Sequence, residues 1–126
     1  MTTFMTERKL LEDAAKAAGL ILIQVPNAAQ TDADWWAYAQ GAAPNTAKPW
    51  SPLTDDGDAL RLAVKVGLTV DSADGTPDGN KDTPATRIDA PDGRMLLIEA
   101  HGSDPYAATR RAIVRAAASL FGTTKE

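Results

Sequence analysis

The segment WSPLTDDGDALRLAVKVGL, residues 50–68, constrains the fold of this chain more than any other stretch. Thr54 offers a side-chain oxygen that can cap the start of a helix. Three aspartates follow in the expected first turn, where the partial positive charge of a helix start favours carboxylates: Asp55, Asp56 and Asp58. Gly67 is the residue type that commonly ends a helix. The segment therefore predicts a helix with a capped start and a defined end.

The apolar residues of this expected helix cover a broad arc. At about 100° per residue, one side of the helix groups Leu53, Asp56, Leu60, Ala63 and Val64, and one flank adds Ala59, Leu62 and Val66. An arc of this breadth predicts that the helix is buried against a sheet and also contacts another helix.

Two further helices and several short strands complete the pattern. Apolar residues recur at helical spacing in residues 6–18 and 104–121, the second preceded by Ser103 or Asp104 as a cap. Short apolar runs predict strands at 20–25, 35–40, 68–71, 86–90 and 95–100. This order predicts an α+β fold, an antiparallel sheet of four or five strands packed against three helices, with an αβα sandwich as a variant. We expect a single domain, 1–126, with a flexible Asp/Gly/Pro-rich loop at 72–84.

Composition excludes several classes of protein. The 17 acidic and 13 basic residues give a net charge of −4, which argues against direct nucleic-acid binding. The chain has no cysteine and one histidine, so we expect no metal site, no disulfide and no cofactor. No run approaches the roughly 20 apolar residues of a membrane span, and the start shows no signal-peptide pattern, so a cytoplasmic location is expected.

The last expected helix carries an arginine on its apolar side. Arg110 projects near the middle of that side, beside Tyr106, whereas Arg111 and Arg115 project toward solvent. Two interpretations of Arg110 stay open. Its head group is paired with a carboxylate, for which the candidates are Asp55, Asp56 and Glu99, or it lines an anion pocket with Tyr106.

The three tryptophans precede the central helix, in or beside irregular backbone. Trp35, Trp36 and Trp50 each offer a flat apolar face and one N–H donor, which suits both a core and a stacking surface. His101 follows an expected strand and precedes Gly102, at the kind of corner where catalytic groups often occur. No serine or cysteine nucleophile pattern accompanies it, so a structural or exposed histidine is the expectation.

Three segments suggest a family: TERKLLEDAAKAAGL, PWSPLTDDGDALRLAVKVGL and DPYAATRRAIVRAAASLFG. Together they resemble small accessory proteins of tailed phages and prophages, including the group described as phage ABA-sandwich domains. The resemblance covers most of the chain and rests on helix starts and alanine-rich faces, and residues 72–84 look like an insertion. It implies a phage accessory protein that works in the cytoplasm of a bacterial host and counters host defence.

Two functions follow as hypotheses. The first is a non-enzymatic, homo-oligomeric anti-defence module that sequesters a small nucleotide signal, because guanidinium groups match phosphates and aromatic rings stack on bases. Its candidate ligand-binding residues are Trp35, Trp36, Trp50, Tyr106, Arg110 and Arg111. The alternative is an acidic protein–protein inhibitor, similar in action to an anti-CRISPR protein, that occupies a basic site on a host defence complex.

Overall fold

The computed structural model describes residues 3–25, 34–72 and 84–122. The three helices are α1 (Thr3–Ala17), α2 (Asp56–Val66) and α3 (Pro105–Gly122). The strands are β1 (Leu20–Val25), β2 (Asp34–Ala39), β3 (Lys48–Pro49), β4 (Thr69–Asp71), β5 (Ala85–Asp89) and β6 (Met95–Ala100), and a short 3-10 turn, η1, covers Pro44–Thr46. The fold is therefore α+β with three helices. Most of the loop expected at 72–84 lies outside the described residues.

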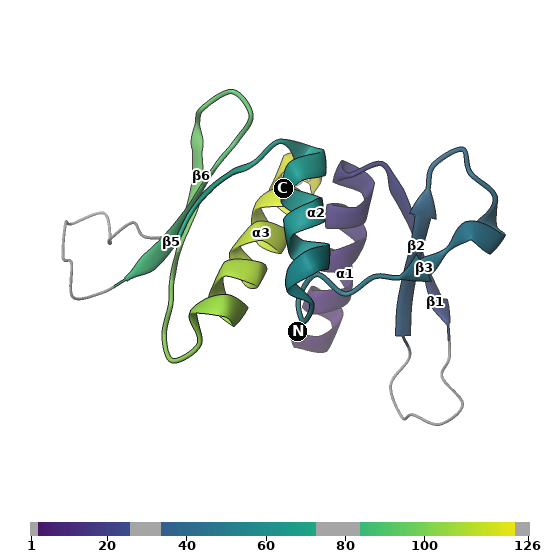
Figure 1. Ribbon diagram of the computed structural model, residues 1–126, viewed down its shortest axis with the longest axis horizontal. Coiled ribbons are helices and arrows are strands. Elements are labelled where there is room, and N and C mark those ends of the chain that lie inside the picture. The colour runs from purple at the N-terminus through teal and green to yellow at the C-terminus, as the bar shows by residue number, and fades with distance from the viewer. Residues whose placement is uncertain (1–2, 26–33, 73–83, 123–126) are drawn as a thin grey trace.

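The strands form two separate antiparallel sheets, in the orders β1-β2-β3 and β4-β5-β6. The helices lie between these sheets, with β1-β2-β3 beside α1 and β5 and β6 beside α3 (Figure 1). The expected single sheet of four or five strands is therefore not what the described residues form. The reason is local: each group of three strands pairs with its neighbours along the chain, and α2 separates the two groups.

A helix followed by a three-stranded meander occurs twice along the chain. Each of these helices is followed by a glycine with a left-handed backbone, Gly19 with φ of 73° and Gly67 with φ of 87°. A residue with a side chain is strained in that conformation, so glycine is favoured where the chain turns from helix into strand. A leucine, Leu20 or Leu68, follows each glycine and packs against the core.

Alanine dominates the contact between α1 and α3, which pack side by side. Ala14 and Ala15 of α1 and Ala116 and Ala117 of α3 are completely buried. Small side chains let helix axes approach closely, and the distance between packed helices depends on the residues at the contact. The centre of the core is therefore a close helix pair, and larger residues such as Leu62 and Val114 fill the space around it.

The start of α2 differs in one residue from the expectation. The N-cap is Asp55, whose Oδ2 accepts a hydrogen bond from Asp58 N at 2.8 Å, because the Thr54 hydroxyl is hydrogen-bonded to that of Ser51. Asp58 in turn accepts from Ser51 N at 2.8 Å and from Arg61 at 2.6 Å, and this second bond raises the pKa of the Arg61 guanidinium. Asp55 and Asp58 therefore hold the segment that leads into α2 in a fixed conformation.

The apolar arc of α2 is only partly buried, which corrects the expectation of burial on two sides. Ala59, Leu62 and Ala63 lie in the core, but Leu60 is 62% exposed and Val64 is 71% exposed. Figure 1 shows the reason, since α2 lies in front of the other two helices and its outward side carries no sheet. The other part of the expectation, contact with another helix, is confirmed, because α2 packs against α3.

Candidate functional site

The candidate residues inferred from sequence fall into two groups in the structure. The tryptophans belong to the side of the molecule that holds β1-β2-β3, and Tyr106, Arg110 and Arg111 belong to α3. Trp50 is buried, and its backbone N donates to Trp35 O at 2.8 Å. Trp35 packs against the core, and the guanidinium carbon of Arg8 lies 5.7 Å from the centre of its ring. The structure does not bring the tryptophans together with the arginines of α3.

Each of the three arginines of α3 has an acidic partner. Arg110 donates from Nη1 to Asp56 Oδ1 at 2.6 Å and from Nε to Leu53 O at 2.9 Å. Asp56 is one of the three carboxylates expected as its partner. Arg111 and Arg115 are exposed, as expected, but both donate to Glu99, at 2.8 Å each. Glu99 therefore holds β6 against α3 through two guanidinium groups.

Tyr106 and Arg110 nevertheless share a hollow of about 470 Å³, here named the α2–α3 hollow. Its apolar lining comes from Ala59, Leu60, Val70, Pro105 and Ile113, and its polar lining from Asp56, Ser72, His101, Thr109 and Arg110, with Tyr106 contributing both. The Tyr106 side chain is exposed, whereas that of Arg110 is only 17% exposed. A mostly apolar hollow of this size with a few convergent polar groups is typical of small-molecule sites.

The polar groups of this hollow include a hydrogen-bonded chain that sequence reasoning missed. His101 Nε2 lies 2.8 Å from the hydroxyl of Thr86, which lies 2.7 Å from the hydroxyl of Thr109. Thr86 is completely buried on β5. Two patterns point to these threonines: Thr86 alternates with the buried Ile88, and Thr109 lies four residues before the buried Ile113.

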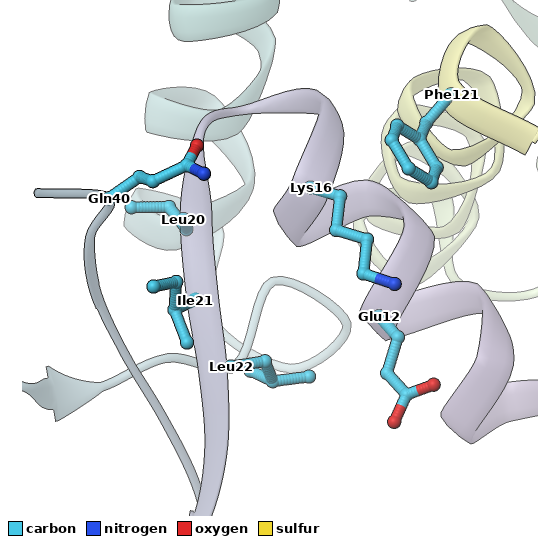
Figure 2. A pocket seen from close by; sticks show the side chains of 7 residues that line it. All are labelled: Glu12, Lys16, Leu20, Ile21, Leu22, Gln40 and Phe121. Carbon is cyan, nitrogen blue, oxygen red and sulfur yellow. The ribbon is translucent and has the colours of Figure 1, made fainter.

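A second hollow, of about 480 Å³, lies between α1, β1 and the end of α3 and is here named the α1–β1 hollow. Figure 2 shows Leu20, Ile21 and Leu22 on one side, with Glu12, Lys16 and Phe121 across from them. The Lys16 ammonium lies 5.5 Å from the centre of the Phe121 ring. None of the six residues proposed from sequence lines this hollow.

Within the described ranges, no group of three or more metal-ligating side chains could hold a metal ion. No helix in that part of the chain is long and apolar enough to cross a membrane. Comparisons with protein-family models, curated proteins and solved structures found no match.

Proposed function

We propose that this protein is a non-enzymatic binding module that sequesters a small nucleotide in the α2–α3 hollow. The observation that supports this most is that Tyr106 and Arg110, an aromatic ring and a guanidinium, line one mostly apolar hollow of about 470 Å³. The resemblance to phage accessory proteins supplies the setting. Capture of a signalling nucleotide in a bacterial cytoplasm removes it from the defence pathway that it activates.

The apolar part of the hollow suits a nucleobase. Tyr106 is 69% exposed and therefore offers an accessible aromatic face, and Leu60 and Ile113 line the same hollow. Stacking of a base on an aromatic side chain contributes about 1–3 kcal/mol and tolerates any base, since every base has a π-face. A base in the hollow covers apolar surface that water otherwise contacts.

The charged part of the hollow suits a ligand of low charge. Nη2 of Arg110 makes no hydrogen bond to any described residue, so this nitrogen can donate to a phosphate oxygen. The partner carboxylate, Asp56, is 69% exposed and lines the same hollow, so it repels a second negative charge. A cyclic nucleotide, a nucleoside monophosphate or an ADP-ribose-type compound therefore fits better than a triphosphate.

Calorimetry against cyclic, monophosphate and ADP-ribose-type nucleotides tests the proposal. We expect micromolar binding of at least one compound and a loss of about 10- to 100-fold in affinity for Tyr106→Ala, because the stacking surface is removed. Phe121→Ala is the matched control, because Phe121 is also an exposed aromatic residue of α3 but lines the other hollow. If every compound binds more weakly than millimolar, or if both variants lose affinity equally, the proposal fails.

The alternative, an acidic inhibitor of a host protein complex, is favoured by one surface. Leu60 and Val64 form an exposed apolar ridge on α2, which begins one helical turn after the exposed carboxylate of Asp56. An apolar strip beside negative charge is complementary to a basic site with an apolar centre.

Pull-down from a bacterial lysate, with mass spectrometry to identify a basic partner, distinguishes this alternative. Val64→Lys is expected to reduce capture of that partner by at least about tenfold, because the substitution removes apolar surface and opposes the acidic charge. It leaves nucleotide affinity unchanged, since Val64 does not line the α2–α3 hollow. Thr69→Lys makes the same charge change at an exposed position outside α2, and equal losses for the two variants contradict a role of the ridge.

A further inference from the structure

Strand β1 has one edge that no strand of the described residues occupies, because β1 lies at the end of the order β1-β2-β3. On the other edge, toward β2, Gln40 N donates to Gly19 O at 2.9 Å. Opposite residues of an antiparallel pair alternate between those that exchange backbone hydrogen bonds and those that do not. The register then directs the backbone N–H and C=O groups of Leu20, Leu22 and Gln24 away from β2, toward the free edge.

This edge lacks the features that usually keep a further strand from pairing. Natural sheets protect their edges with short strands, charged side chains and proline. The opposite edge of the same sheet has such protection, since β3 consists of Lys48–Pro49 alone. By contrast, β1 has six residues, LILIQV, with no charge and no proline. The free edge of β1 can therefore accept a further strand.

The α1–β1 hollow lies along this free edge. Neighbouring residues of a strand point to opposite faces of its sheet, yet Leu20, Ile21 and Leu22 all line the hollow. Leu20 and Leu22 also pack against the core, whereas Ile21 is 37% exposed. A hollow that receives side chains from both faces lies beside the strand, and Figure 2 shows α1 and Phe121 across from it. A strand added to β1 therefore places alternate side chains in the hollow.

The charges of the hollow indicate what such a strand must carry. The Lys16 ammonium lies 5.5 Å from the centre of the Phe121 ring and forms no ion pair with any described residue. Glu12, the other charged residue of the hollow, is paired with Arg8 at 3.5 Å. The hollow thus offers apolar surface and one cation whose charge is not matched, which is complementary to apolar side chains and one carboxylate.

We propose that the free edge of β1 binds an extended segment of a partner protein, which adds an antiparallel strand with apolar side chains in the α1–β1 hollow and a carboxylate at Lys16. Backbone hydrogen bonds along the edge supply the affinity, and the hollow supplies the specificity. A second copy of β1 matches less well, because LILIQV has no carboxylate for Lys16. The inference goes beyond the nucleotide site, since the two hollows share no lining residue.

A titration with the capped peptide TLTETLT, followed by nuclear magnetic resonance, tests the site. In an antiparallel strand whose leucines and glutamate face the hollow, the N–H groups of these same residues point to β1. We expect saturable binding below about 1 mM, with the largest amide shifts at Leu20, Leu22 and Gln24. Absence of saturable binding, or equal shifts in β6, the six-residue edge strand of the other sheet, overturns the site.

Methylated peptides test strand addition separately from side-chain contacts. N-methylation of both leucines of TLTETLT removes two donors that point to β1, so we expect at least about tenfold weaker binding. N-methylation of the two threonines that flank the glutamate adds the same groups on the outer edge, and the expected change is within about twofold. Equal affinities of the two methylated peptides overturn strand addition.

A charge reversal tests the carboxylate. Lys16→Glu is expected to weaken binding of TLTETLT by about three- to tenfold and to strengthen binding of TLTKTLT, because the substitution turns attraction into repulsion and the reverse. Lys65→Glu is the matched control, because Lys65 is also an exposed lysine in the last turn of a helix but does not line this hollow. Equal changes for the two variants contradict the pairing with Lys16.

Two further measurements separate this proposal from its neighbours. A dimer in light scattering that dissociates as TLTETLT binds would place a second copy on β1 and overturn the assignment to a partner segment. Phe121→Ala is expected to weaken peptide binding and to leave nucleotide affinity unchanged, since Phe121 lines only the α1–β1 hollow. Unchanged peptide binding by this variant overturns the role of the hollow, whatever the outcome for the nucleotide site.

Discussion

Replacing Leu62 by alanine is expected to lower the free energy of unfolding by about 2–5 kcal/mol. Leu62 is among the largest completely buried side chains and lies on the side of α2 that packs into the core. Its truncation removes apolar contacts and leaves a cavity that the surrounding helices fill only in part. Chemical denaturation monitored by circular dichroism measures the loss.

Leu60→Ala is the matched control, since it is the same substitution two residues earlier on the same helix. Leu60 is 62% exposed, so the expected change is within about 0.5 kcal/mol. A large loss for Leu60→Ala and a small one for Leu62→Ala would show that α2 is rotated about its axis. Such a rotation would place Leu60 in the core in place of Leu62, so the pair distinguishes the two orientations of α2.

Enlarging Ala14 to leucine is expected to destabilise the protein by about 1–3 kcal/mol or more, for the opposite physical reason. Ala14 is completely buried in α1, which packs against the alanine-rich side of α3. Three additional carbon atoms have no space between helices whose separation is set by alanine, so the helices move apart or the side chain leaves its preferred rotamer. The same denaturation measurement gives the size of the effect.

The control for this prediction is Ala17→Leu, near the end of the same helix. Ala17 is only half-buried, so the added carbons can extend toward solvent and the expected loss is below about 1 kcal/mol. If the two substitutions cost the same, the contact between α1 and α3 is looser than the buried alanines indicate.

The three helices and the β5–β6 hairpin were predictable because their sequence signals are local. The N-cap Asp55 and the C-cap Gly67 define the two ends of α2. Asp104 caps α3, because its side chain accepts hydrogen bonds from the backbone N of Tyr106 and of Ala107, at 3.1 Å each. The turn at 91–93 joins β5 to β6, with Ala90 N donating to Arg94 O at 2.7 Å. Each of these features depends on residues within a few positions of one another.

The arrangement of the elements was not predictable from such signals. Periodicity places Leu60 and Val64 on an apolar side of α2, but it cannot show whether another element covers that side. The strand pattern likewise fits one sheet or two, because it contains no information about which edges pair. Two sheets form here because each meander pairs within itself.

The candidate site was predictable in part. The position of Arg110 among apolar residues led to a short list of partners that includes Asp56, its partner in the structure. Tyr106 and Arg110 line one hollow, whose lining contains none of the tryptophans that were expected in the same site. The chain of His101, Thr86 and Thr109 joins residues from two strands and a helix, so only the fold reveals it.

The placement of the helices between the two sheets determines how cooperative unfolding can be. Among the residues that the structure describes, no strand of one sheet pairs with a strand of the other, so fraying of one ladder leaves the other ladder intact. Any cooperativity between the two halves must therefore pass through side-chain packing in the helical layer. We therefore expect the buried alanines between α1 and α3 to couple the unfolding of the two meanders.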